Sequence, residues 1–300
     1  MGKHAYLIMA HSNMNQLKNL VRCLDSELND IYIHVDKKYK DLNPDDVAET
    51  AAKSKISFCK RISVNWGGYS LVEARFLLLE CAHNNGPYDF YHFLSGQDLP
   101  LQPQSSIHKF FDEHKDEEFI SIGPEDDWYL KRVKYFWPFR DVSWGRTILG
   151  RIMNNGFYAL QMLLRVNMIK NSKIKFYNGE EWFSVTERFV EYALSMKDFC
   201  DKVFKYGDRT DEMVFPTIYM MWPGANRRYV SPYKSEIFNS QRMDVLRAID
   251  WDRGKPYTYR VEDYDLLKNS HCLFARKFNE DVDSKIIERI TADVIESNAE

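Results

Sequence analysis

The chain has 300 residues, of which 44% are hydrophobic and 15% aromatic, and its formal net charge is −3. This composition excludes a disordered chain and argues against a protein that attracts nucleic acid through its overall charge. The five cysteines lie far apart and form no C-x-x-C pair, so we expect reduced, mostly buried thiols. No apolar stretch is long enough for a signal peptide or a membrane span, so a cytoplasmic protein is expected, with peripheral membrane contact left open.

Strand-like and helix-like patterns alternate through the first hundred residues. The sequence predicts strands at 4–11, 30–38, 55–60 and 88–101, and helices at 15–26 and 70–84. Strands that alternate with helices form a parallel sheet, and ligands bind at the carboxyl ends of such strands. We therefore expect an α/β fold with a mostly parallel central sheet flanked by helices.

Polar residues stand at three of these predicted strand ends, namely His11, Asp36 and Asp98. A single Asp in such a place is most often a turn or cap residue, but three converging polar side chains favour a ligand site. Asp98 lies in the stretch YHFLSGQDLPL, in which Pro100 is expected to prevent further regular strand pairing.

Several common enzyme motifs are missing from the sequence. No G-x-G-x-x-G follows the first strand and no G-x-x-x-x-G-K-S/T occurs, so dinucleotide and P-loop phosphate binding are unsupported. H-E-x-x-H, G-x-S-x-G and clustered Cys and His are also missing, which removes the usual support for a hydrolase or a zinc enzyme.

Six stretches carry a family resemblance: AYLIMAH, IYIHVDKK, WGGYSLVEARFLLLECA, FYHFLSGQDLPL, TDEMVFPTI and LFARKF. In this order they resemble the core-2/I-branching glycosyltransferase family, glycosyltransferase family 14, between about Ala5 and about Asp283, apart from a poorly matched segment, 123–177. The resemblance implies a GT-A-type nucleotide-sugar-binding fold and inversion at the sugar carbon. It also implies a UDP-sugar donor that is bound with no divalent metal and no other cofactor. We expect one domain over 1–300, with a nucleotide-sugar-binding half at 1–122 and an acceptor-binding and catalytic half at 123–300.

A donor site without a metal gives Asp98 a different role from that of a metal ligand. A single acid beside Gln97 is a poor cage for a divalent ion, which two acids would hold better. The resemblance leaves Asp98 free to accept hydrogen bonds from sugar hydroxyls, with stabilisation of the turn before Pro100 as the alternative.

Cationic side chains must then neutralise the donor diphosphate. The resemblance assigns this role to Lys277, with Arg276 beside it, and to Arg253, for which Lys255 and Arg260 are competing candidates. Without the resemblance, Arg276 and Lys277 could equally be an ordinary basic surface at a helix end.

An acceptor hydroxyl must lose its proton as it attacks the sugar carbon. The stretch GDRTDEMVFPTIYM offers Asp211 and Glu212, which could also be ordinary first-turn acids of the helix that follows. The resemblance assigns the base to Glu212, with Asp211 as its neighbour and Asp211 or Glu181 as the next acid to examine.

Other residues are assigned to the walls of the site. In GEEWFSVTERFVEYAL, Glu181 and Trp182 resemble the family's acceptor pocket, although Trp182 could equally be core, and Tyr135 is placed on the acceptor side as well. In VNWGGYSLVEA, Trp66 and Gly67 are candidates for a donor-side loop, although Gly-Gly before a helix is also an everyday turn.

The segment 131–175 carries ten basic residues and the single acid Asp141, interleaved with aromatic residues. This pattern fits peripheral contact with the inner face of a membrane, whereas the alternatives are a nucleic-acid groove and a solvated basic surface packed on the core. We do not expect nucleic acid as a partner.

The sequence therefore predicts an inverting, metal-independent transferase that moves N-acetylglucosamine from a UDP-sugar to a saccharide or lipid-linked saccharide, in bacterial surface glycan synthesis. The alternatives are a xylosyl or glucuronosyl donor, or a non-catalytic binding protein on the same fold.

Overall fold

A five-stranded sheet forms the centre of the protein, in a computed structural model that describes residues 2–123, 126–235 and 238–299. Its strands, in spatial order, are β3 (Lys55–Phe58), β2 (Asn29–Val35), β1 (His4–Ala10), β4 (Phe90–Ser95) and β6 (Ser184–Thr186). The first four are parallel and β6 runs antiparallel to β4. The predicted α/β class, with a mostly parallel sheet flanked by helices, is confirmed.

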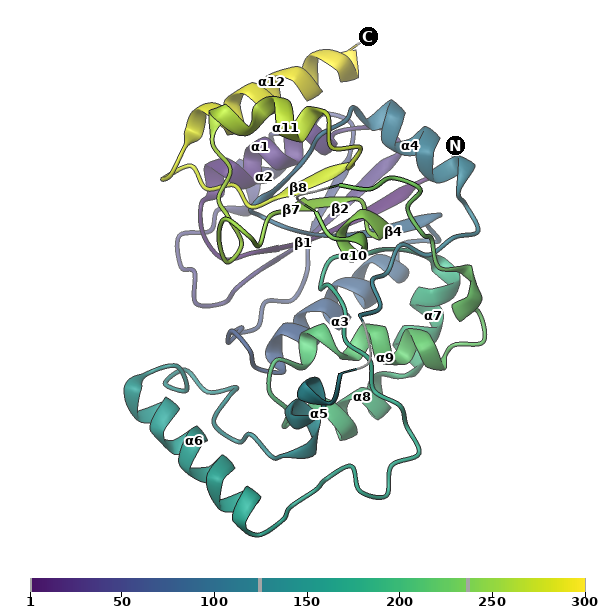
Figure 1. Ribbon diagram of the computed structural model, residues 1–300. Helices are drawn as coiled ribbons and strands as arrows, with labels where there is room; N and C mark the ends of the chain where they lie inside the picture. Colours follow the sequence, from purple (N-terminus) through teal and green to yellow (C-terminus); the bar gives the residue numbers. More distant parts are fainter. Residues whose placement is uncertain (1, 124–125, 236–237, 300) are drawn as a thin grey trace.

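Helices cover both faces of this sheet (Figure 1). On one face lie α1 (Met14–Leu24) and α12 (Ser284–Ala299), and on the other α3 (Ser70–His83), α7 (Glu187–Ser195) and α9 (Val214–Met221). Successive residues of β1 point to opposite faces, so Tyr6 and Ile8 pack in the first core and Leu7 in the second. A strand buried on both sides reads as a continuous apolar run, which is why its sequence shows no alternation.

A second sheet of three strands lies against the first. β5 (Asp98–Pro100) pairs antiparallel with β8 (Phe274–Arg276), which pairs parallel with β7 (Arg247–Ile249). The expectation that Pro100 prevents further pairing is therefore wrong. β5 is an edge strand, and proline is tolerated at an edge because one side of the strand needs no partner. Both halves of the chain contribute strands to both sheets.

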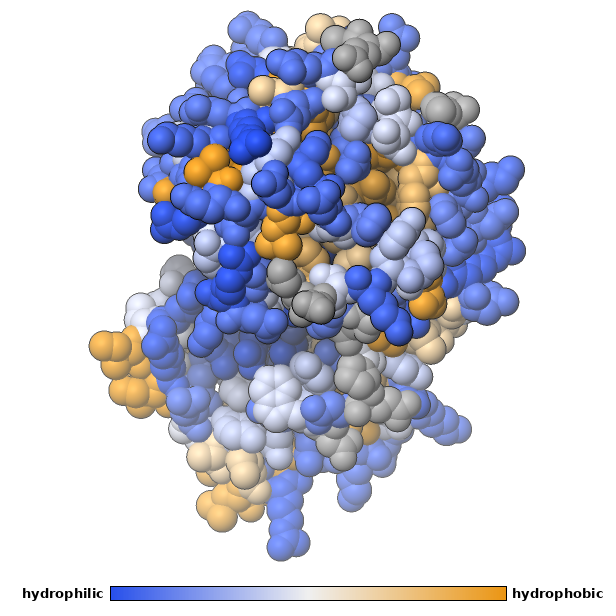
Figure 2. Space-filling view, turned by 45° about the horizontal axis from the view of Figure 1, so that its top comes forward, coloured by the Kyte–Doolittle hydropathy of each residue, from blue (hydrophilic) through white to orange (hydrophobic). Residues whose placement is uncertain are grey.

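The remaining helices are short, with one exception. They are α2 (Pro44–Ala48), α4 (Gln104–Glu113), α5 (Asp127–Lys134), α8 (Lys197–Phe204), α10 (Ser240–Asp244) and α11 (Tyr264–Lys268), with the 3-10 turns η1 (Thr210–Glu212), η2 (Ala225–Arg227) and η3 (Val261–Asp263). The exception is α6 (Ile148–Leu163), which lies at the end of the molecule away from α12 (Figure 1). Apolar side chains are exposed in the corresponding region at the lower margin of Figure 2. Within the described residues, no helix is both long enough and apolar enough to cross a membrane.

Candidate active site

The carboxyl edge of the larger sheet carries His11 and Asp36, as the sequence predicts. His11 directly follows β1 and Asp36 directly follows β2. Asp36 forms an ion pair with Lys38 at 3.4 Å and accepts a hydrogen bond from the Lys38 backbone N–H at 2.9 Å. Their donor-binding role stays a prediction.

Asp98 is almost fully buried, and protein groups occupy its carboxylate. It accepts hydrogen bonds from the backbone N–H and the hydroxyl of Ser95 at 2.8 and 2.9 Å. The Arg276 guanidinium donates a further bond at 2.8 Å, across the pairing of β5 with β8. This geometry favours a carboxylate that fixes the turn after β4 and orients Arg276 over one that contacts sugar directly.

Arg276 and Lys277 share an electrostatic neighbourhood with the strand-end residues. Burial and the adjacent Arg276 lower the pKa of Lys277. Burial and Arg276 also lower the pKa of His11, while Asp36 acts in the opposite direction. In the described part of the chain, no ion pair joins Lys277 to a carboxylate, so its ammonium is available for an external anion.

A group of acids lies near these cations. The fully buried Arg75 of α3 binds the Glu181 carboxylate at 2.7 Å and donates to the backbone carbonyl of Asp211 at 3.4 Å. The Gly179 backbone N–H donates to the Glu212 carbonyl at 2.9 Å. Helix α3, the loop before β6 and the turn η1 therefore meet at one point, although they are far apart in the sequence.

Asp211 and Glu181 shift each other's pKa in this arrangement. Burial and the nearby Glu181 raise the pKa of Asp211 well above its ordinary value. Burial alone would raise the pKa of Glu181, but Arg75, a hydrogen bond with Asp211 and the charge of Arg276 together outweigh it, so that the pKa of Glu181 is lowered. A protonated Asp211 can donate a hydrogen bond to the Glu181 carboxylate, and it cannot act as a base while it holds that proton.

Glu212 has a separate cationic partner. The Arg132 guanidinium of α5 binds the Glu212 carboxylate at 2.5 Å and the Arg209 carbonyl at 3.2 Å. The Glu212 side chain is 34% exposed and that of Glu181 is 28% exposed, so both can meet an acceptor from solvent.

Trp182 joins the acids to the cations. Its ring lies under the guanidinium of Arg276 at 4.5 Å and under that of Arg75 at 5.7 Å, within the range of a cation–π interaction. Trp182 is only 8% exposed and packs in the core behind β6. It therefore acts mainly as a core residue that aligns two arginines, and only its edge could contact a sugar.

Trp66 and Gly67 lie beside the turn that carries Glu212. The Gly67 carbonyl accepts a hydrogen bond from the Arg209 backbone N–H at 3.0 Å, one residue before η1. Gly67 has a φ of 77°, which favours glycine, and Trp66 is 57% exposed beneath Arg146. Their proposed place on the donor side stays a prediction.

Two predicted site residues lie in other surroundings. Arg253 is held by Asp250 at 2.5 Å and by Asp263 at 2.7 Å; burial acts to lower its pKa, but these hydrogen bonds raise it. A guanidinium with two carboxylate partners is less available to a diphosphate than Lys277 is. Tyr135 lines a hollow of about 320 Å³ between α5 and α6, together with Tyr158, Asn167 and Ile169.

Arg75 and Arg132 are the site residues that sequence reasoning missed. Arg75 sits inside the apolar pattern of α3, three residues after Val72 and four before Leu79, so helical spacing puts it on the buried face. A charge on a buried helix face requires a partner, and that was the available signal. Arg132 and Arg140 belong to the basic segment 131–175 in the sequence, but in the fold Arg132 binds Glu212 and Arg140 binds Asp208 at 2.9 Å.

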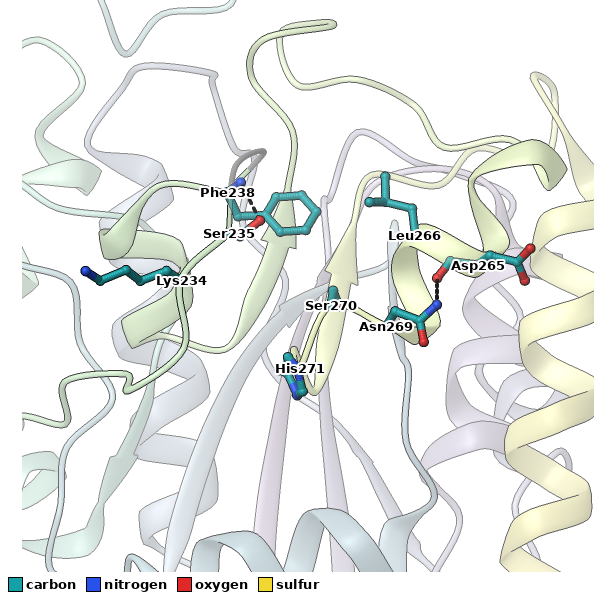
Figure 3. A pocket seen from close by; sticks show the side chains of 8 residues that line it. All are labelled: Lys234, Ser235, Phe238, Asp265, Leu266, Asn269, Ser270 and His271. Carbon is teal, nitrogen blue, oxygen red and sulfur yellow. Dashed lines mark hydrogen bonds between the residues drawn. The ribbon is translucent and has the colours of Figure 1, made fainter.

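Another hollow, of about 290 Å³, lies between α11 with the turn that follows it and the segment that carries Lys234, Ser235 and Phe238 (Figure 3). Its polar groups bond to their neighbours: the Asn269 amide donates to the Asp265 carbonyl, and the Ser235 hydroxyl accepts from the Phe238 N–H. It contains none of the predicted site residues. Among the described residues no cluster of His, Cys, Asp and Glu is arranged to hold a metal ion, and metal-free donor binding stays a prediction.

The Asp211→Asn substitution tests whether the folded protein keeps this proton. An unfolded Asp loses its proton near its ordinary pKa of about 3.9, whereas folded Asp211 retains it at higher pH. The folded state then binds more protons than the unfolded state, so stability falls as pH rises above that value. We expect urea unfolding to show that the variant gains stability relative to the wild type between about pH 5 and about pH 8.

Glu181 does not mask this effect, because its lowered pKa costs stability only below the ordinary Glu pKa of about 4.3. The control is Asp41→Asn, at an exposed position. A relative stability of Asp211→Asn that does not change with pH would show that Asp211 is ionised in the folded protein.

Known proteins share this chain's sequence pattern. It is 22% identical over 301 residues to Xylosyltransferase 2 of Canis lupus familiaris, covering 95% of this chain and 33% of that protein. It is 23% identical over 300 residues to Xylosyltransferase 1 of Homo sapiens, covering 94% and 29%. The chain thus spans about a third of the length of these curated relatives. The crystal structure of mouse xyloside xylosyltransferase 1, apo form, aligns with a TM-score of 0.35 at 13% identity, over 92% of this chain and 97% of that one.

A family model described as Branch: Core-2/I-Branching enzyme matches residues 4–268, from the start of β1 to the end of α11. Because that match covers most of the residues, the chain belongs to the core-2/I-branching enzyme family.

Proposed function

We propose that the chain is an inverting glycosyltransferase that moves a sugar from a UDP-sugar to a hydroxyl group of a saccharide acceptor. The proposal depends on one observation. Around Trp182, acids that can accept a proton lie close to cations that can neutralise a diphosphate. Membership of the core-2/I-branching enzyme family supports the reaction class.

In the proposed reaction the acceptor oxygen attacks the anomeric carbon as the bond to UDP breaks. The acceptor proton passes to a carboxylate, and UDP leaves with the electron pair of the broken bond. Attack from the face opposite UDP inverts the sugar carbon. The acids and the cations must therefore lie on opposite sides of the transferred sugar. The site contains a separate group of each kind.

Glu212 is the base that we propose. Burial and Glu181 raise the pKa of Asp211 and so favour its protonated form, whereas Glu212 is partly exposed at the end of η1 and is oriented by Arg132. Glu181 is the alternative, because it is also partly exposed and its pKa is lowered, but Arg75 holds it as an anion from within the core.

Lys277 is the cation that we propose for the diphosphate, with Arg276 beside it. Arg276 already binds Asp98, so Lys277 is the one of the two whose charge is not matched by an ion pair in the described residues. Both residues lie after the last residue of the family match, so their role rests on geometry and on the sequence resemblance. Arg253 is a weaker candidate because of its two acidic partners.

The donor sugar is N-acetylglucosamine in the sequence-based proposal. The similarity to xylosyltransferases favours xylose as the second candidate, and glucuronic acid is a third. A free or lipid-linked saccharide acceptor and a part in bacterial surface glycan synthesis remain proposals.

A panel of donors tests the proposed function. UDP-N-acetylglucosamine, UDP-xylose and UDP-glucuronic acid would each be incubated with the chain in EDTA, and UDP release measured. We expect slow hydrolysis of one donor over the others, since water can replace the acceptor. Tight UDP binding with no release from any donor, and no transfer to a panel of saccharides, would instead indicate a non-catalytic binding protein.

Glu212→Gln tests the base. The amide keeps the shape of the side chain but cannot take up a proton, so we expect turnover to fall by about a hundredfold or more while UDP affinity stays unchanged. Glu262→Gln, at an exposed position in η3, is the matched control. If Glu212→Gln retained near-native turnover and Glu181→Gln lost it, the base would be Glu181.

Lys277→Ala tests the diphosphate site. Titration calorimetry with UDP in EDTA should give measurable affinity for the wild type and about tenfold or greater weakening for the variant, because a charge-assisted contact is lost. Turnover should fall as well, since the same cation stabilises the leaving group. The control is Lys285→Ala, an exposed lysine at the start of α12. Wild-type affinity that disappears in EDTA would contradict the metal-free site.

A further inference from the structure

Helix α6 turns most of its aliphatic side chains toward solvent, whereas its protein-facing side combines small and polar residues with Phe157 and Tyr158, which pack on Phe136 and Trp137. The buried positions include Gly150, Asn154 and Gln161. The Gln161 amide accepts from the Phe136 N–H at 2.9 Å and donates to the Phe136 carbonyl at 2.8 Å, and the Asn154 amide donates to the Phe139 carbonyl at 3.3 Å. An ordinary surface helix turns its aliphatic stripe toward the core, whereas α6 leaves its aliphatic side chains exposed.

The solvent side of α6 forms a continuous apolar face. With 3.6 residues per turn, its members fall on one side of the helix and its C-terminal end. They are Ile148, Leu149, Ile152, Met153, Leu160, Leu163 and Leu164, of which Ile148 is 79% exposed and Leu163 80% exposed. Figure 2 shows apolar side chains gathered at the margin of the molecule where α6 lies. A contiguous apolar face of this kind marks an interaction site, because monomeric proteins rarely leave one exposed.

The charge around this face has one sign. No Asp or Glu occurs between Asp141 and Glu180. Arg151 within the helix and Arg165 just after it are exposed cations, and neither of them forms an ion pair within the described part of the chain. Trp144, before the helix, is also partly exposed. An apolar helix face bordered by unpaired cations and an aromatic residue matches the interface of an anionic lipid bilayer.

We propose that α6 lies in the plane of an anionic membrane surface, with its apolar face inserted among the acyl chains and its bordering cations at the lipid phosphates.

A second copy of this chain fits this face less well than a membrane does. A symmetric dimer through this face would bring the same cations of both copies together, with no acid from 142–179 to neutralise them. This inference does not depend on which sugar is transferred.

Vesicle sedimentation of the full chain tests the proposal, with phosphatidylcholine vesicles and with vesicles that also contain phosphatidylglycerol. We expect strong partitioning only onto the anionic vesicles. Ile152→Ser combined with Leu163→Ser should lower the partition coefficient about tenfold or more, because both side chains lose apolar area that the bilayer would bury. Arg151→Gln combined with Arg165→Gln should lower it about thirtyfold, each cation contributing about 1 kcal/mol.

Matched controls come from the opposite end of the molecule, where α4 and α12 lie (Figure 1). Ile295→Ser removes an apolar side chain that is 38% exposed, and Lys109→Gln combined with Lys285→Gln removes two exposed charges. Neither should change partitioning, and circular dichroism would verify that all variants are folded. Absent wild-type binding, or equal losses from the controls, would overturn the proposal. A wild-type dimer that becomes monomeric with Ile152→Ser and Leu163→Ser, as seen by light scattering, would overturn it in favour of contact between copies.

Discussion

The arrangement of the site depends on the buried guanidinium of Arg75. A charge that is removed from water must be paired, and the carboxylate of Glu181 supplies the partner. Arg75 also donates to the Asp211 carbonyl, so one side chain of α3 fixes the loop before β6 and the turn η1 together. Burial, together with the negative charge of the neighbouring Glu181, raises the pKa of Asp211 and favours its neutral form. Glu212, the next residue, is then the acid of η1 that remains open to solvent.

The cations follow the same physical rule on the other side of Trp182. Arg276 is mostly buried and takes its partner from Asp98, across two paired strands of the smaller sheet. Asp98 is held in turn by Ser95, the last residue of β4 in the larger sheet. The pair therefore connects the two sheets and fixes the backbone from which Lys277 projects. Arg276, whose charge is paired with Asp98, supports the structure of the site. Lys277 beside it has no carboxylate partner among the described residues, so an anionic ligand can bind to it.

The part of the fold that could be predicted from the sequence depends mostly on local patterns of apolar and polar residues. The strands before His11 and Asp36 were predicted because apolar runs and helical periods depend on near neighbours. The role of Asp98 could not be predicted, since its partner Arg276 is 178 residues away and reaches it only through the pairing of β5 with β8. The same limit explains Arg253: the family resemblance assigns it to the diphosphate with Lys277, but Asp250 and Asp263 hold it in the fold. Arg75 was overlooked because a helix that is apolar around it gives no sign of which acid will pair with it.

The basic segment 131–175 shows why net charge alone does not assign a function. Its charge divides into two sets that the sequence does not distinguish. Arg132 and Arg140 point inward to Glu212 and Asp208, where they order the turn that carries the proposed base. Arg151 and Arg165 remain outside, beside the apolar face of α6. Because Gln161 of α6 binds the backbone of Phe136, two residues after α5, the helix that we place on the membrane is joined to the helix that supplies Arg132. A surface that fixed α6 would thereby also fix the orientation of the acid group toward acceptors carried by that surface.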